Sequence, residues 1–119
     1  MRVALIQMSV TADRARNITA ACQHIRRAAE GGADMAVLPE MFCCPYDNGC
    51  FRAYGEEAGG PAQTALSKAA AELGLYVVGG SLPELEGGKV YNTSYVYGCR
   101  GELLAKHRKV HLFDIDVAG

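Results

Sequence analysis

The amino-acid sequence predicts an α/β fold, and two observations support that prediction. Short apolar runs recur at residues 2–8, 35–38 and 75–80, as is typical of strands that are buried in a parallel sheet. The segments between them carry apolar residues at helical spacing and are followed by glycines. A strand, a helix and a second strand in this order require a right-handed crossover between two parallel neighbours.

The N-terminal third of the chain contains the first strand and the first helix. Residues 3–6 form a continuous apolar run, which predicts a strand covered on both faces. Thr11 or Asp13 can cap the helix that follows, and Gly31-Gly32 ends it. The apolar face of this helix consists of Ile18, Ala21, Cys22, Ile25 and Ala28.

The segment from Pro39 to Gly60 is predicted to be irregular, because prolines and glycines punctuate it. Loops of this length are usually functional or disordered. Pro61 then suits the first turn of a second helix, which Gly74 closes. The apolar face of the second helix consists of Ala65, Leu66, Ala69, Ala70 and Leu73.

The last third of the sequence predicts antiparallel strands at one side of the sheet. Gly87-Gly88 marks a turn, and residues 91–97 alternate as a strand does. Gly98–Gly101 provides a hairpin-like connection to a further strand at residues 103–105. Residues 113–119 end in mid-loop. Because the alternation of strands and helices should continue, we expect that the sequence has been cut.

Composition and charge narrow the range of functions. The chain is long enough for one domain at most, which would span residues 1–119. Its formal net charge is −1, whereas a nucleic-acid-binding domain is typically basic. No apolar run approaches the ~20 residues that cross a bilayer, and the N-terminal run is too short for a signal peptide. We therefore expect a cytoplasmic protein whose partners include neither nucleic acid nor a membrane.

Glu40, in Leu38-Pro39-Glu40-Met41-Phe42, is the first candidate for chemistry. It follows a predicted buried strand at its C-terminal end, where open α/β sheets bind their ligands. Apolar Met41 and Phe42 would desolvate its carboxylate and raise its pKa, as suits a general base. From position alone, an exposed acid that caps the loop or pairs with a lysine is the more frequent alternative.

The second candidate is a run of basic and ionisable residues, Lys106-His107-Arg108-Lys109-Val110-His111. One of its cations could face an anionic transition state, or the whole run could be a solvated strand end. The run is short and has no interleaved aromatic residues, so it offers little surface for binding the phosphates of a nucleic acid. The pattern alone leaves the first two alternatives open.

The five cysteines indicate reduced thiols, because their number is odd and no CxxC pair exists. A metal site could draw on Cys43, Cys44, Cys50, His107 and His111, but adjacent cysteines cannot easily both reach one tetrahedral ion. The sequence also lacks a glycine-rich phosphate loop. We therefore expect neither a metal nor a cofactor.

Five segments occur in the order in which one known family carries them: residues 3–8, 38–42, 79–81, 91–93 and 106–114. Through these segments the whole chain resembles the nitrilase superfamily of carbon–nitrogen hydrolases, and within it the ω-amidase-type branch. The resemblance implies an α-β-β-α sandwich of two sheets packed face to face, of which this chain would be the N-terminal part. It also implies cleavage of amides or nitriles by a Glu–Lys–Cys triad.

Carried over by that resemblance, Glu40 matches the general base and Lys109 matches the lysine that stabilises the oxyanion. The nucleophilic cysteine of the family, and a second glutamate, follow the lysine. Only ten residues follow Lys109 here, and none is cysteine. The resemblance thus implies a small amide as substrate, no nucleophile within this chain, an inactive fragment, and a homo-oligomer for the full-length protein.

The expected function is therefore that of an ω-amidase-like hydrolase, and the alternative is a non-catalytic interaction or pseudo-enzyme module with the first half of the fold. Tyr46, Arg52 and Tyr54 in the long loop could reach a substrate or serve in packing. Half of a sandwich leaves one sheet face uncovered, so we also expect an exposed apolar patch and self-association.

Overall fold

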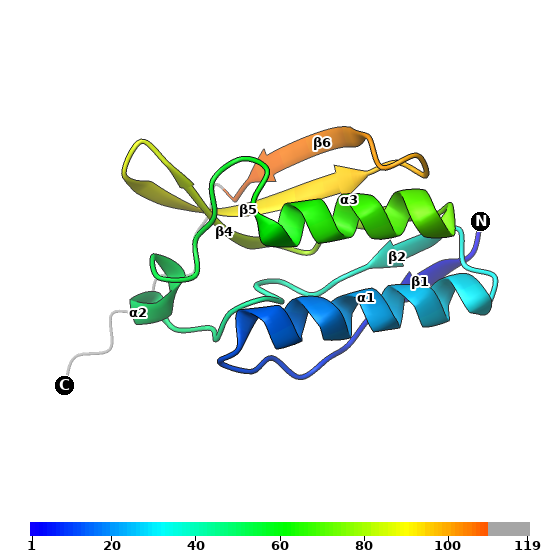
Figure 1. Cartoon of the computed structure of the whole chain (residues 1–119), viewed down its shortest axis with the longest axis horizontal. Helices are drawn as coiled ribbons and strands as arrows, with labels where there is room; N and C mark the ends of the chain where they lie inside the picture. Colours follow the sequence, from blue (N-terminus) through cyan, green and yellow to red (C-terminus); the bar gives the residue numbers. More distant parts are fainter. Residues whose placement is uncertain (110–119) are drawn as a thin grey trace.

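Three helices and six strands make up the part of the chain that the structure describes, which is residues 1–109 of a computed structural model (Figure 1). In chain order they are β1 (Val3–Leu5), α1 (Arg14–Glu30), β2 (Met35–Val37), α2 (Asn48–Phe51), α3 (Pro61–Leu73), β3 (Tyr76–Val78), β4 (Leu82–Glu86), β5 (Lys89–Tyr97) and β6 (Leu103–Arg108). The predicted α/β class is confirmed. Candidate residue His111 and the end of the 106–114 motif lie outside the described residues.

All six strands belong to one sheet. β1, β2 and β3 are parallel neighbours, as crossovers through helices require. β5 runs antiparallel to β3, β4 and β6. β3 pairs with Tyr97 and Val96 of β5, and β4 pairs with its residues 89–93, so β3 and β4 follow one another along one edge of β5. β6 takes the other edge, since it pairs with residues 93–97.

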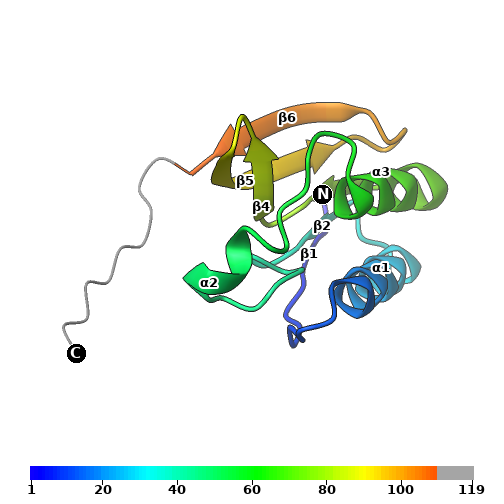
Figure 2. The ribbon, with the colours of Figure 1, turned by 60° about the vertical axis from the view of Figure 1, so that its left-hand side comes forward.

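α1 and α3 lie side by side on one face of this sheet (Figures 1 and 2). Asp13 begins α1 by accepting a hydrogen bond from the Arg16 N–H at 3.1 Å. Gly74 ends α3 in the left-handed conformation, at φ 66°. The core lies between helices and sheet, and its fully buried members include Ala21, Ile25, Ala36, Leu66, Ala70 and Val77.

The opposite face of the sheet carries no helix among residues 1–109, and its apolar side chains are partly or largely exposed. Leu5 is 81% exposed and Val3 46%, whereas Ala36 and Val77, which face the helices, are fully buried. Successive side chains of a strand point to opposite faces, so one covered face buries only alternate residues. The prediction that residues 3–6 are covered on both faces is therefore wrong within the described part, and the expected uncovered apolar face is confirmed there.

Two short elements were not predicted from the sequence. α2 is a four-residue helix within the segment predicted to be irregular, and the Asp47 side chain caps it by accepting from the Gly49 N–H at 2.9 Å. β4 contains Pro83 and two glutamates, which break an apolar strand pattern. Proline is tolerated there because β4 is an edge strand whose outer side forms only an isolated bridge, to Glu56.

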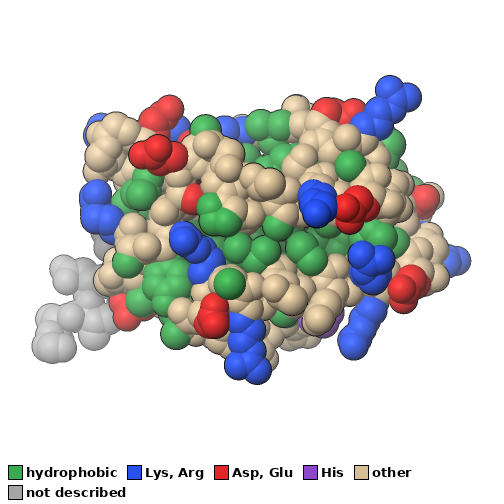
Figure 3. All heavy atoms as spheres, in the orientation of Figure 1, with side chains coloured by type: hydrophobic (Ala, Val, Ile, Leu, Met, Phe, Trp, Pro, Cys, Tyr) green, Lys and Arg blue, Asp and Glu red, His purple; other side chains and the backbone are tan. Residues whose placement is uncertain are grey.

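The outer surface of α1 and α3 mixes charged and apolar side chains (Figure 3). Between the two helices lies an open cavity of about 390 Å³, whose apolar lining includes Ile18, Cys22, Ala69 and Leu73. Within residues 1–109, no helix combines the length and the apolar character that crossing a membrane demands.

Candidate active site

Glu40 lies directly after β2 and Pro39, at the C-terminal ends of the parallel strands. The chain leaves the sheet here, after a last ladder-like hydrogen bond of 2.9 Å from the Leu38 N–H to the Val78 carbonyl oxygen. The Glu40 side chain remains 45% exposed. The predicted position of the acid at the ligand-binding end of the strands therefore agrees with the structure.

The segment that follows β3 supports this turn. At Gly80, φ is +52°, and a Cβ there would lie 2.0 Å from the Pro39 carbonyl oxygen, so only glycine permits this approach of the two segments. The hydroxyl of Ser81 accepts a hydrogen bond from the Met41 N–H at 3.0 Å. Met41 itself turns inward with φ 50° and is 2% exposed. Gly80 and Ser81 thus hold the turn in which Glu40 points outward and Met41 inward.

Lys109 lies just past the end of β6, on the same face of the sheet as His107. Its Nζ donates a hydrogen bond to Glu40 Oε1 at 3.0 Å. Its backbone N–H donates to the Asn92 carbonyl oxygen at 2.8 Å, which continues the pairing of β5 with β6 by one residue. The structure therefore brings together the two candidates that the sequence separates widely.

Asn92, on β5, is a third member of the cluster and was not predicted as a site residue. Its side-chain amide donates to Glu40 Oε1 at 2.8 Å, so this oxygen accepts from both Asn92 and Lys109. Asn92 belongs to the 91–93 segment on which the family resemblance rests, and that segment is the only sequence signal that points to it.

The electrostatics of the cluster differ from the prediction. The hydrogen bond from Lys109 lowers the pKa of Glu40, and it outweighs the opposing effect of desolvation. The hydrogen bond from Asn92 lowers this pKa further, and the neighbouring Tyr46 makes a smaller contribution in the same direction. The prediction of a raised pKa is wrong, because the apolar neighbour Phe42 is buried in the core while the Glu40 carboxylate stays partly in solvent next to a cation. The same hydrogen bond to Glu40 raises the pKa of Lys109.

An open cavity of about 350 Å³ surrounds the cluster. It is lined by Val37, Leu38, Glu40, Val78, Gly80, Ser81, Asn92, Ser94, His107 and Lys109. Val37, Val78, Ser94 and His107 come from four neighbouring strands and point to the face without helices. The acid, the amide and the amine therefore converge at the edge of the uncovered face.

The model of one protein family, described as carbon-nitrogen hydrolase, matches residues 2–119. This chain belongs to the carbon–nitrogen hydrolase family. It is 48% identical over 118 residues to proteins named omega-amidase NIT2 from Mus musculus and from Homo sapiens. These alignments cover 99% of this chain but 43% of each relative, so the chain spans less than half the length of these curated hydrolases.

Solved structures of carbon–nitrogen hydrolases have the same fold. Saccharomyces cerevisiae Nit3, described as a member of branch 10 of the nitrilase superfamily, matches with a TM-score of 0.85 and 37% identity, over 92% of this chain and 44% of that one. An amidase from Nesterenkonia sp. matches with a TM-score of 0.83 and 29% identity, over 97% of this chain and 44% of that one. The nitrilase-type α/β class is thereby confirmed.

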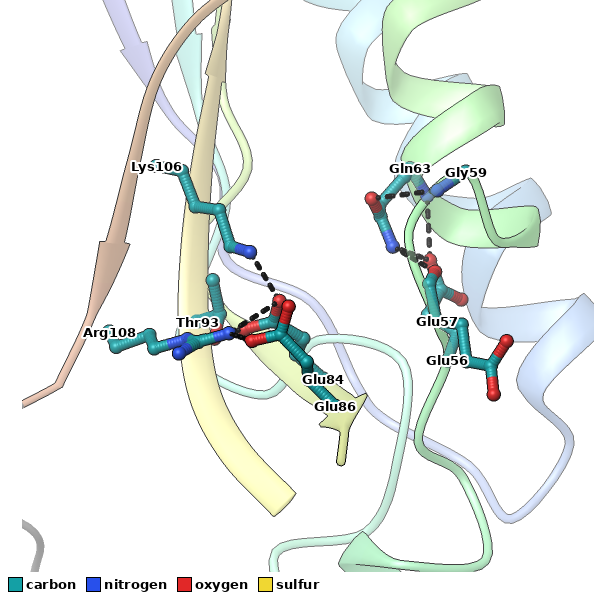
Figure 4. Close-up of polar contacts among 9 residues, drawn as sticks. All are labelled: Glu56, Glu57, Gly59, Gln63, Glu84, Glu86, Thr93, Lys106 and Arg108. Carbon is teal, nitrogen blue, oxygen red and sulfur yellow. Dashed lines mark hydrogen bonds and ion pairs between the residues drawn. The ribbon is translucent and has the colours of Figure 1, made fainter. Parts of the chain in front are cut away.

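Lys106 and Arg108 of the basic run alternate with His107 along β6 and so point to the opposite face of the sheet, where they meet two glutamates (Figure 4). Lys106 and Arg108 both bind the carboxylate of Glu84, which Thr93 also contacts at 2.7 Å, and Arg108 reaches Glu86 as well. Burial disfavours the charged form of Glu84, but the hydrogen bonds from Arg108, Lys106 and Thr93 outweigh it and lower its pKa to about 2.

All five cysteines of this family member are unpaired thiols. Cys43 and Cys44 are fully buried, and burial raises their pKa to about 12 and about 11. These thiols are protonated at neutral pH, which makes them poor nucleophiles. Among residues 1–109, no three His, Cys, Asp or Glu side chains gather in a way that could hold a metal ion.

The three loop residues considered as substrate contacts have different positions. Tyr46 lies near Glu40 and helps to lower its pKa. Arg52 donates to the Gly88 carbonyl oxygen at 3.0 Å, and the Tyr54 hydroxyl donates to the Ala12 carbonyl oxygen. Arg52 and Tyr54 therefore connect the long loop to neighbouring segments by hydrogen bonds.

Proposed function

We propose that the protein carrying this chain is an amidase that hydrolyses the C–N bond of a small amide, with the ω-amide of a dicarboxylic acid as the substrate class. The observation that carries the proposal is the 3.0 Å contact between Lys109 and Glu40 in an open cavity. Identity of 48% to omega-amidases supports the substrate class. In this proposal Glu40 is the base, Lys109 is the cation, and a cysteine outside these 119 residues completes a Glu–Lys–Cys triad.

The first step of the proposed reaction is transfer of the thiol proton to Glu40. A free thiol with a pKa near 8.5 is mostly protonated at neutral pH, so it needs a base. Glu40 is ionised at neutral pH because its neighbours lower its pKa. The thiolate then forms a bond to the amide carbon, and the electron pair of the C=O bond moves to the oxygen.

The negative charge on that oxygen is where Lys109 acts. A fixed ammonium group beside a developing oxyanion lowers the barrier, because the charge forms next to a partner that is already in place. Collapse of the intermediate breaks the C–N bond, and the leaving nitrogen takes the proton from Glu40. Glu40 then removes a proton from water, whose oxygen attacks the thioester carbon. The C–S bond breaks, the sulfur takes the proton back from Glu40, and the acid is released.

We further propose that residues 1–119 alone do not turn over amides. Cys43 and Cys44 are the thiols nearest to Glu40 in the sequence, and both are buried and protonated at neutral pH. A base and a cation without a nucleophile can bind and polarise an amide, but they form no thioester.

The test compares purified residues 1–119 with the longer protein that contains them, by measuring ammonia release from α-ketoglutaramate and from a simple amide. We expect turnover only by the longer protein, reduced about 10²- to 10⁴-fold by Glu40→Gln and abolished by thiol alkylation. Glu30→Gln, at an exposed position of α1, is the matched control and keeps the rate. A longer protein without turnover would contradict the proposal and favour a non-catalytic interaction module. Turnover by residues 1–119 that Glu40→Gln removes would contradict their inactivity.

A further inference from the structure

Asn92 contacts both members of the Lys109–Glu40 pair. Its backbone carbonyl oxygen accepts from the Lys109 N–H at 2.8 Å, and its side-chain amide donates to Glu40 Oε1 at 2.8 Å. One residue on β5 therefore sets the position of the backbone of the lysine and the orientation of the carboxylate.

The register of the sheet explains why Asn92 can do both. Thr93 pairs with Arg108, and the next opposed pair along the antiparallel ladder is Asn92 with Lys109. Opposed residues of antiparallel strands point to the same face, with their Cβ atoms about 4.5–5.5 Å apart. The two side chains therefore emerge next to each other and meet the same oxygen of Glu40.

The shared acceptor also orients the carboxylate. Lys109 and Asn92 both bind Oε1, at 3.0 and 2.8 Å, which turns the Oε2 edge away from these two donors. A carboxylate that removes a thiol proton needs one oxygen directed at the thiol. The geometry assigns the anchoring to Oε1 and leaves Oε2 for proton transfer.

We propose that Asn92 is a positioning residue, which holds Glu40 in place while Lys109 turns its ammonium group to the oxyanion. This inference rests on the proposed amidase function. Once Glu40 has taken a proton it loses its charge, and the ion pair with Lys109 weakens. A neutral amide donor does not depend on that charge, so the bond from Asn92 keeps the carboxyl group aimed when the lysine contact loosens.

The proposal predicts a separation of kcat from KM. Asn92→Ala removes a hydrogen bond to a charged group, which corresponds to a loss of about 10- to 100-fold in kcat, with KM changed by less than about threefold. Asn48→Ala, at an exposed asparagine of α2, is the matched control and keeps both constants. Asn92→Asp keeps the shape and the backbone bond, but it places a second carboxylate beside Glu40.

The experiment measures two quantities in the longer protein that contains this chain. The first is the pH profile of kcat/KM. Asn92→Asp moves the acid limb of this profile to higher pH by about one unit or more, because a neighbouring like charge raises the pKa of Glu40. The second is the pKa of the Glu40 carboxyl group, measured by ¹³C NMR with the signal assigned by means of Glu40→Gln. Both Asn92 variants raise this pKa.

The outcomes separate the two proposals. An unchanged Glu40 pKa in both variants, or an Asn92→Ala enzyme with kcat within twofold of wild type, would overturn the role of Asn92. Absence of turnover by the wild-type protein would reject the amidase function instead, and the NMR titration would still decide whether Asn92 anchors Glu40. A thermal melt of each variant identifies a loss of folding, for which Asn92→Asp is the near-isosteric replacement.

Discussion

Lys109 Nζ lies 3.0 Å from Glu40 Oε1, although 69 positions separate the two residues in the sequence. Glu40 follows a parallel strand, β2, and Lys109 follows an antiparallel strand, β6. The two strands lie on opposite sides of the β3–β5 pair, so the site spans the junction between the parallel and antiparallel parts of the sheet. Each group stabilises the charged form of the other, and both are therefore charged at neutral pH.

Replacement of Lys109 by methionine tests this mutual stabilisation. The hydrogen bond from Lys109 is the largest cause of the lowered Glu40 pKa, so Lys109→Met raises that pKa toward or above its ordinary value. A lowered carboxyl pKa gives stability that is present above the unfolded-state pKa and is lost as pH falls through the folded-state pKa. The variant therefore begins to lose the charge of Glu40 at a higher pH than wild type does.

The measurement for Lys109→Met is the ¹³C titration of the Glu40 carboxyl group between pH 2 and 7. Lys89→Met, at an exposed lysine of β5, removes the same charge elsewhere and leaves the Glu40 pKa unchanged. An equal Glu40 pKa in Lys109→Met and wild type would show that the contact does not form in solution.

The buried carboxylate of Glu84 is predicted to stabilise the fold. Its side chain is 3% exposed and binds Lys106 and Arg108, whose side chains are 35% and 34% exposed. Glu84→Gln leaves two partly buried cations without their partner, at a cost of about 2 kcal/mol once solvent screening of the exposed partners is considered. Urea denaturation at pH 7 measures this loss.

The exposed neighbour of Glu84 is the matched control. Glu86 also binds Arg108 but is 63% exposed, so Glu86→Gln changes the free energy of unfolding by about 0–1 kcal/mol. The pKa of Glu84 falls from 4.5 to about 2 on folding, so its contribution is complete above pH 4.5 and is lost as the pH falls toward 2. In Glu84→Gln, the free energy of unfolding lacks this part of its dependence on pH. If variant and wild type showed the same dependence, the ion cluster would not form in solution.

Local sequence signals predicted the elements whose own residues determine them. The cap Asp13, the helix-ending Gly74 and the Gly87-Gly88 turn are recognisable without tertiary structure, and the structure has them at these places. β4 was not predicted, because a strand with Pro83 is stable only at an edge, and the sequence does not show which strand lies there.

The site shows the same division between local and tertiary information. Glu40 could be placed at a strand end from the sequence, and its proposed role as the base rests on the family resemblance. The direction of its pKa shift could not be predicted, because that shift depends on Lys109, which the fold brings from 69 positions away. Asn92 was missed for a related reason, since an asparagine within a strand contacts Glu40 and Lys109 only when the register sets it opposite Lys109.

Gly80 is predicted to be essential for the turn that carries Glu40. Gly80 and Gly87 have similar backbone conformations, at φ +52° and +59°, but they differ in the space around them. A Cβ at Gly80 would lie 2.0 Å from the Pro39 carbonyl oxygen, whereas at Gly87 nothing lies within 4 Å. Gly87→Ala therefore costs about 1 kcal/mol of backbone strain, and Gly80→Ala costs about 3 kcal/mol or more.

Urea denaturation of the two alanine variants isolates the close approach, because their backbone strain is nearly equal and cancels in the difference. A Gly80→Ala variant with the stability of Gly87→Ala would show that the turn at Pro39 moves away at little cost. The position of Glu40 would then not depend on Gly80.

The uncovered sheet face is predicted to drive self-association of purified residues 1–119. Leu5 and Val3 lie exposed on this face, where Met35 and Val37 of β2 are their cross-strand neighbours. Apolar surface in contact with water favours association, by about 25 cal/mol for each Å² that becomes buried. Leu5→Glu places a charge on the β1 side of this surface and shifts the equilibrium toward the monomer.

Sedimentation velocity across a range of concentrations measures that shift. Val10→Glu, at a position 37% exposed and outside the strands, introduces the same charge without touching the sheet face, and it leaves association unchanged. A wild-type chain that stays monomeric and melts cooperatively would contradict the prediction, because an apolar sheet face of this kind would then be stable in water without a covering layer.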